Sequence, residues 1–165
     1  MRASDVSLEV IEDFLLQRRI AVVGVSRQGR DISMHLVSEL QRRGYEIFLV
    51  NPKANEIAGQ RCYVRVQDIQ PPPDGALVLT NPSLTGSVVR DCADAGIRRV
   101  WMFRGGGQGA VSSEAVEFCR AMDIKGIPGQ CPFMFLDPVR NIHWLHRCFA
   151  KLARKYPQRA KFISA

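Results

Sequence analysis

The stretch Ile20–Gly29 places the tightest constraint on how this chain can fold. An unbroken apolar run, Ile20–Val23, meets a turn with glycines at positions 24 and 29, and a helical pattern begins near Ile32. Apolar runs without polar alternation are typical of strands buried on both faces. A strand, a glycine-containing turn and a helix present backbone N–H groups and a positive helix end, which favours a bound phosphate. Because Ser26 replaces the middle glycine of G-x-G-x-x-G, this pattern alone is a weak indication of a nucleotide site.

The rest of the chain alternates between strand-like and helix-like patterns. Apolar spacing predicts helices over 4–17, 31–43, 82–95 and 112–122, and a last helix that opens at 137–138. It predicts further strands over 45–50, 76–80, 99–103 and 125–127, and a short edge strand over 62–66. Such alternation indicates an α/β fold, a doubly wound and mostly parallel Rossmann-like sheet in a single domain with extra N- and C-terminal helices.

Charge separates the body of the chain from its tail. The net charge is +7, yet seven of the 23 basic residues and none of the 16 acidic ones follow Asp137. We therefore expect a formally neutral domain over 1–139 and a basic helix and tail over 140–165. The basic residues fit contact with nucleic acid or an acidic partner, or simply the solvated side of a terminal helix whose apolar stripe serves a subunit interface.

Cysteine usage and hydropathy indicate where the protein works. The five cysteines are scattered and never spaced as C-x-x-C, which favours reduced, buried thiols over disulfides or a zinc ribbon. The N-terminus lacks the apolar core of a signal peptide, and no apolar run approaches the roughly 18 residues of a membrane span. We expect a cytoplasmic protein.

In doubly wound sheets, ligands bind at the carboxyl ends of the strands, at the point where strand order reverses. Four predicted strand ends are therefore relevant: 24–29, 51–53, 80–82 and 104–109. The second is the most discriminating, because an NAD site requires a carboxylate there to bind the ribose diol. Asn51-Pro52-Lys53 offers a lysine instead, which suits a ribose phosphate. The alternatives are a solvated loop lysine and an ordinary Asn-Pro turn.

At this point the sequence resembles a known family. The resemblance rests on Ile20–Ser26, Arg30-x-x-Ser33, Gly44-Tyr45, Val50–Lys53, Glu56-Ile57-x-Gly59 and Tyr63. Together these segments resemble the stand-alone CoA-binding proteins, single Rossmann-like domains similar to the CoA-binding domain of the succinyl-CoA synthetase α subunit. The resemblance covers roughly residues 15 to 135.

The resemblance implies a site for coenzyme A or an acyl-CoA. The turn Gly24–Arg27 and Lys53 would hold the phosphates and the adenosine end, and Thr80–Pro82 would line the other side of the cleft. The 3′-phosphate of CoA requires cationic or N–H donors where NAD requires a carboxylate. The full set of expected binding residues is Gly24, Val25, Ser26, Arg27, Arg30, Asn51, Pro52, Lys53, Thr80, Asn81, Pro82, Arg104 and Gly105.

Two features depart from the family pattern. Many relatives have an arginine near the fourth strand end, where this chain has Thr80-Asn81. The loop Arg104–Gly109 is longer and richer in glycine than expected, and it suits either an anion-binding nest or a tight surface turn.

The sequence predicts no catalytic residues and no metal site. Ser26 lacks a G-x-S-x-G context, and His143 and His146, three residues apart, have no evident third ligand beyond Cys148. Cys131 could form a mixed disulfide with the CoA thiol if it faces the cleft; otherwise it is a packed, inert thiol.

The similar synthetases carry their phosphorylated histidine and acyl chemistry in further domains. The sequence therefore favours a non-catalytic binding, sensor or regulatory protein, with a possible homo-oligomer or partner subunit, over a complete ligase. Two alternatives stay open: an NADP-dependent oxidoreductase that uses Lys53 for the 2′-phosphate, and an interaction module that uses the basic C-terminal helix.

Overall fold

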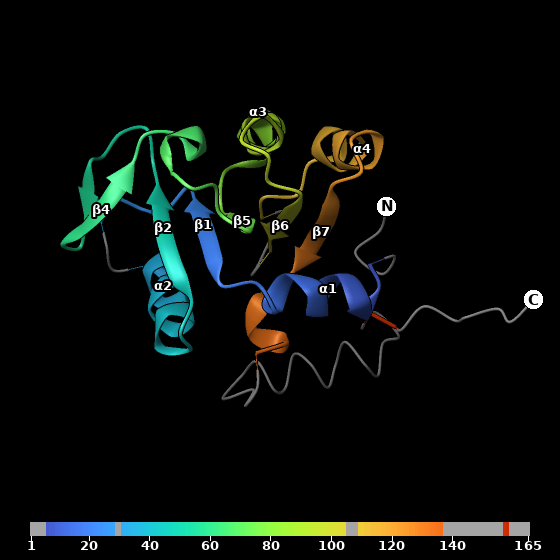
Figure 1. Ribbon diagram of the computed structural model, residues 1–165, viewed down its shortest axis with the longest axis horizontal. Coiled ribbons are helices and arrows are strands. Elements are labelled where there is room, and N and C mark those ends of the chain that lie inside the picture. Colours follow the sequence, from blue (N-terminus) through green and yellow to red (C-terminus); the bar gives the residue numbers. More distant parts are fainter. Residues whose placement is uncertain (1–5, 29–30, 105–108, 137–156, 159–165) are drawn as a thin grey trace, which may run out of the picture.

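A seven-stranded sheet forms the centre of the molecule in the computed structural model, which describes residues 6–28, 31–104, 109–136 and 157–158 (Figure 1). The strands are β1 (Arg19–Val23), β2 (Glu46–Val50), β3 (Glu56–Ile57), β4 (Gln60–Tyr63), β5 (Gly75–Val78), β6 (Arg99–Phe103) and β7 (Lys125–Gln130). Their spatial order is β3-β4-β2-β1-β5-β6-β7, and every pair is parallel except β3–β4. The expected mostly parallel α/β sheet is confirmed.

Helices cover both faces of the sheet. They are α1 (Leu8–Leu15), α2 (Ile32–Arg42), α3 (Pro82–Asp94) and α4 (Ser113–Ala121), with short 3-10 turns η2 (Val66–Asp68) and η3 (Pro132–Met134). Figure 1 shows α1 and α2 on one face and α3 and α4 on the other. Two hydrophobic clusters fill the space between helices and sheet. In β1, Ile20 and Val22 belong to the cluster that includes α1 and α2, whereas Ala21 and Val23 belong to the other. The uninterrupted apolar run is explained because both faces of β1 are buried.

The strand order reverses on the two sides of β1. The chain runs from β1 to β2 and β4, and then returns to pair β5 with the opposite edge of β1. Val23 lies level with both Val50 and Val78, so the three strands end at nearly the same height. Their following loops consequently emerge together at the topological switch point, where ligands bind in this architecture.

Capping residues mark the ends of α2 and α3. Asp31 accepts hydrogen bonds at the start of α2, and Asn81 caps α3 with Pro82 in its first turn. Gly44 and Gly96 have positive φ angles of 85° and 81° after their helices, where an L side chain would be strained. Local sequence chemistry therefore sets the length of both helices.

Several element boundaries differ from the sequence-based expectation. The first helix is shorter, Leu8–Leu15, and the last described strand is longer, reaching Gln130. The edge region is a hairpin of β3 and β4 rather than one short strand. The helix expected after Asp137 and the basic tail lie outside the described residues, apart from Pro157 and Gln158. No helix among the described residues is both long and apolar enough to span a membrane.

Candidate functional site

A cavity of about 470 Å³ opens at the carboxyl ends of β1, β2, β4 and β5. This volume lies within the range of small-molecule sites. One side is formed by the turn after β1 and the loops after β2 and β5, and the other sides by the segment after β4 and by α3. The lining residues are Val23, Gly24, Val50, Asn51, Pro52, Lys53, Val64, Arg65, Val66, Leu79, Thr80, Asn81, Leu84, Ser87, Val88 and Asp91. The cavity thus coincides with the switch point of the sheet.

Gly24 allows the close approach of two strand ends at the base of this cavity. Its φ is +90°, and its N–H donates to the Val50 carbonyl at 2.9 Å. A Cβ at this position would lie 2.8 Å from Thr80 Cγ2 and 3.0 Å from the Thr80 nitrogen. Both the backbone angle and the contact with Thr80 therefore require glycine.

The turn after Gly24 is organised by side chains from α2. Ser33 Oγ accepts a hydrogen bond from the Ser26 N–H at 3.0 Å and donates to Asp31 Oδ1 at 2.5 Å. Ser26 Oγ accepts from the Gln28 N–H at 3.3 Å. Among the described residues, the amides of Val25 and Arg27 have no hydrogen-bond acceptor. Because Val25 is fully buried, the amide of the exposed Arg27 is the donor in the described part of the turn that remains available to an anion.

The N-terminus of α2 is capped by the chain itself. Asp31 Oδ1 accepts from the Ser33 and Met34 amides at 3.0 and 3.4 Å. Burial alone would raise the pKa of Asp31, but hydrogen bonds from the Ser33 and Ser26 hydroxyls and the two amides lower it. The helix end that was expected to face a phosphate therefore carries an ionised carboxylate instead.

Asn51 joins the loop after β2 to the turn after β1. Its Nδ2 donates to the Val25 carbonyl at 2.8 Å, and its Oδ1 accepts from the Lys53 N–H at 2.8 Å. The Asn-Pro turn is therefore real, and it also places Lys53 at the cavity wall. The Lys53 side chain is exposed.

Thr80 and Asn81 form the opposite side of the cavity. Asn81 Oδ1 accepts from the Ser83 N–H at 3.2 Å, and the Thr80 and Thr85 hydroxyls are 3.2 Å apart. These bonds fix the first turn of α3 against the end of β5. Both residues line the cavity, while Pro82 does not.

The described structure brings together six of the thirteen expected residues and leaves five others outside the cavity wall. Gly24, Asn51, Pro52, Lys53, Thr80 and Asn81 line it. Val25, Ser26, Arg27, Pro82 and Arg104 do not, although the first three continue the turn directly from Gly24. Arg30 and Gly105 lie outside the described residues, as do His143, His146 and Cys148.

The loop that begins at Arg104 closes tightly on the end of β6. The Ala110 N–H donates to the Phe103 carbonyl at 2.8 Å, and a Cβ on Gly109 would lie 2.5 Å from that oxygen. Gly109 therefore serves a tight turn. Residues 105–108, on which an anion-binding nest would depend, lie outside the described residues.

Ten of the sixteen residues that line the cavity were missed from the sequence, and four of them are the most informative. Arg65 and Val64 lie in the segment after β4, and Leu84 and Asp91 lie on α3. The spacing of Leu84, Val88 and Cys92 is that of one apolar stripe on a helix, which predicts that all three face the core. Instead, Cys92 is fully buried against the sheet, whereas Leu84 is 55% exposed and lines the cavity. An apolar ligand wall and an apolar core face have the same helical spacing, so periodicity could not separate them.

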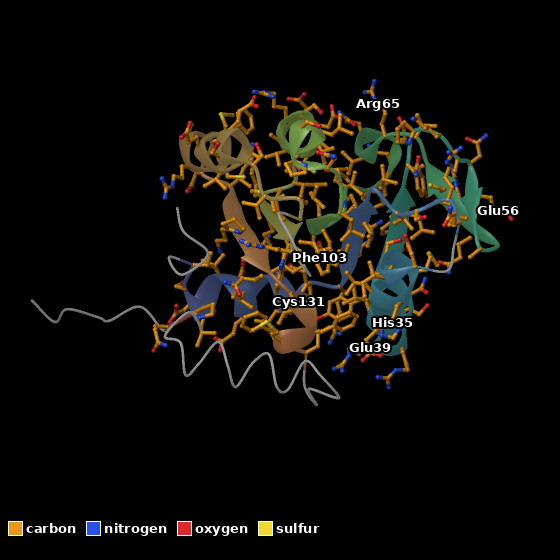
Figure 2. The ribbon with its side chains drawn as sticks, turned by 180° about the vertical axis from the view of Figure 1, so that it is seen from behind. His35, Glu39, Glu56, Arg65, Phe103 and Cys131 are labelled. Atoms are coloured by element: carbon orange, nitrogen blue, oxygen red, sulfur yellow. The ribbon has the colours of Figure 1, made fainter. Side chains whose placement is uncertain are left out.

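Cys131 lies on the other side of the sheet from this cavity. It is 8% exposed within the cluster that packs α1 and α2, and burial raises the pKa of its thiol. Figure 2 shows Cys131 on the α1–α2 side and Arg65 on the α3 side. The structure supports the packed thiol rather than a partner for the CoA sulfur.

Fold and site together define a Rossmann-like α/β domain with a ligand-sized cavity at its topological switch point. Residues 18–137 match the model of the CoA binding domain family, and the chain belongs to this family. The resemblance found in the sequence motifs is confirmed.

Comparisons with individual proteins agree with this assignment. The chain is 28% identical over 96 residues to an acetate–CoA ligase (ADP-forming) II of Archaeoglobus fulgidus, covering 57% of this chain and only 14% of the ligase. It is 30% identical over 113 residues to the uncharacterized protein YneT of Bacillus subtilis, covering 68% of this chain and 80% of YneT. Among solved structures, a hypothetical protein from Pyrococcus horikoshii superposes with a TM-score of 0.71 at 25% identity, over 78% of this chain and 89% of that one.

Proposed function

We propose that this protein binds coenzyme A or an acyl-CoA in the cavity at the switch point. The observation that carries the proposal is the convergence of the Gly24 turn, Lys53 and the Thr80–Asn81 strand end on one cavity, in a chain that belongs to the CoA binding domain family. The match to an acetate–CoA ligase, although confined to a small part of that enzyme, supports the same ligand.

The charges around the cavity suit the phosphates of CoA. Lys53 and Arg65 both line the wall, are exposed and form no ion pair within the described part of the chain, so they can meet a 3′-phosphate. The Arg27 amide, which has no acceptor among the described residues, lies in the exposed turn that continues from Gly24, where it can donate to the diphosphate. Asn51 fixes both groups relative to one another because it bonds the Val25 carbonyl and the Lys53 amide.

The same cavity favours binding over catalysis. Among its described lining residues there is neither a histidine nor a cysteine, and its one carboxylate, Asp91, is held by a glutamine amide. We therefore propose a sensor, carrier or regulatory role. The acyl chemistry of the matched ligase is not part of the proposal.

Titration of Lys53→Ala with CoA and with dephospho-CoA tests the assigned phosphate contact. Loss of one charge-assisted hydrogen bond, worth about 1.5–3 kcal/mol, should weaken CoA binding by about tenfold or more. Dephospho-CoA binding should change little. Equal weakening of both ligands would refute a role of Lys53 in recognising the 3′-phosphate.

Arg61→Ala is the matched control. Arg61 is also exposed on β4, but it stacks on the Tyr63 ring and does not line the cavity. Its replacement should leave the ratio of CoA to dephospho-CoA affinity unchanged, whereas Arg65→Ala should lower that ratio.

A further inference from the structure

One wall of the cavity is a single face of α3. Leu84, Ser87, Val88 and Asp91 follow the i, i+3, i+4, i+7 spacing and all four line the cavity. This face begins beside the Thr80–Asn81 strand end and ends, further along α3, at the carboxylate of Asp91. The far part of the cavity thus has one acidic group beyond an apolar stretch.

The Asp91 carboxylate is held in position from a neighbouring element. Gln67 in η2 donates from Nε2 to Asp91 Oδ1 at 2.9 Å. A carboxylate oxygen has further lone pairs, so Asp91 can still accept hydrogen bonds from a ligand. Because its amide partner is neutral, Asp91 also keeps its negative charge uncompensated by an ion pair among the described residues.

The walls before Asp91 are apolar and open. Leu84 is 55% exposed and Val64 is 45% exposed, and both line the cavity from the two elements that flank it. Large apolar side chains left accessible inside a cavity favour a flat aromatic group, which buries them while its polar edge remains free. The polar edge of such a ring would point to Asp91.

We propose that Asp91 recognises the exocyclic 6-amino group of the adenine base, so that it determines base specificity at this site. The inference rests on the proposed function, because it assumes that the nucleotide part of CoA occupies the cavity. Opposite charges orient the ligand: phosphates are attracted to Lys53 and Arg65 and repelled by Asp91. An amino group donates to the carboxylate, whereas the 6-oxo group of hypoxanthine would place a second acceptor against it.

The test compares CoA with its 6-oxo analogue, in which hypoxanthine replaces adenine, by calorimetric titration. Wild-type protein should bind CoA at least tenfold more tightly than the analogue, because the Asp91 carboxylate loses a hydrogen bond when it faces a second acceptor. In Asp91→Asn the new amide can donate to the 6-oxo group, so the ratio should fall to about one. Asp91→Asn keeps a side-chain oxygen that can accept the hydrogen bond from Gln67. The affinities for CoA and for its 6-oxo analogue are compared in the same variant, so a general effect of the substitution on the fold applies to both ligands.

Asp94→Asn is the matched control, since Asp94 is an exposed carboxylate on the same helix and is not part of the cavity wall. It should keep the wild-type preference for adenine. Equal wild-type affinity for the two ligands, or an unchanged ratio in Asp91→Asn, would overturn the inference and leave CoA binding intact. Failure of wild-type protein to bind CoA would overturn the proposed function and this inference with it.

Discussion

Replacing Asn51 should separate the two loops that form the base of the site. The Asn51 side chain makes two hydrogen bonds of 2.8 Å, to the Val25 carbonyl and from the Lys53 amide. Alanine at this position removes both bonds and leaves Pro52 and Lys53 without a fixed position relative to the Gly24 turn. The perturbation therefore affects stability and ligand binding through the same two contacts.

The size of the effect follows from these bonds. A typical intramolecular hydrogen bond contributes about 0.5–1.5 kcal/mol net, so Asn51→Ala should lower the free energy of unfolding by about 1–3 kcal/mol. Asn51→Asp can still accept from the Lys53 amide, but its carboxylate cannot donate to the Val25 carbonyl and faces it with an acceptor. We expect Asn51→Asp to be destabilised at least as much as Asn51→Ala.

Urea unfolding followed by tryptophan fluorescence measures the change, since Trp101 is fully buried and its Nε1–H donates to the Gln130 carbonyl. Asn55→Ala is the control, because Asn55 is exposed in the same loop and its backbone carbonyl, which the substitution keeps, accepts the hydrogen bond from the Cys62 N–H. Substitutions at ordinary surface sites usually change the free energy of unfolding by no more than about 0.5 kcal/mol. If the free energies of unfolding of Asn51→Ala and Asn55→Ala differ by less than this amount, the reasoning about Asn51 fails.

Three further outcomes are expected. Gly24→Ala should lower both stability, by about 1–3 kcal/mol, and CoA affinity, because a Cβ would lie 2.8 Å from Thr80 Cγ2 at a φ of +90°; an unchanged unfolding midpoint would contradict this. The hydrogen bond from Arg99 lowers the pKa of Asp13 despite burial, with help from the neighbouring Lys125, so Asp13→Asn should cost about 1 kcal/mol at pH 7. This difference should be fully present above the unfolded-state pKa of about 4 and should be lost as the pH falls through the lowered pKa of folded Asp13, and a pH-independent difference would contradict the assignment. Burial raises the pKa of Cys92 to about 12, so native protein at pH 8 should leave Cys92 unmodified by a thiol reagent in peptide mapping; rapid labelling would show that α3 is not packed as described.

The helices predicted over 31–43 and 82–95 agree with α2 and α3, whose ends are set by local chemistry. Asn81 followed by Pro82 marks the start of α3, and Gly44 marks the end of α2, because each satisfies a backbone requirement within a few residues. The apolar run of β1 predicted a doubly buried strand, and from it the parallel sheet. The turn at Gly24 and the loop at Asn51–Lys53 meet at the cavity because strand ends in a parallel sheet lie at one edge.

What the sequence did not reveal depends on contacts between distant segments. Arg65 and Asp91 both line the cavity because the segment after β4 packs beside α3, and nothing in either local pattern specifies that contact. The β3–β4 hairpin turns through Ala58 and Gly59, both with positive φ. An Asn-Gly or Asp-Gly pair would have indicated such a turn, whereas alanine gives no such signal.

The central claim is that the cavity at the switch point takes a CoA-type nucleotide. Isothermal titration of the wild-type protein with CoA, dephospho-CoA, NADP and NAD, in the presence of a reductant, tests it most directly. We predict that CoA binds most tightly, that dephospho-CoA binds more weakly, and that NAD binds least because no carboxylate follows β2 at Asn51–Lys53. Tighter binding of NADP than of CoA, or binding of none of the four ligands, would contradict the account.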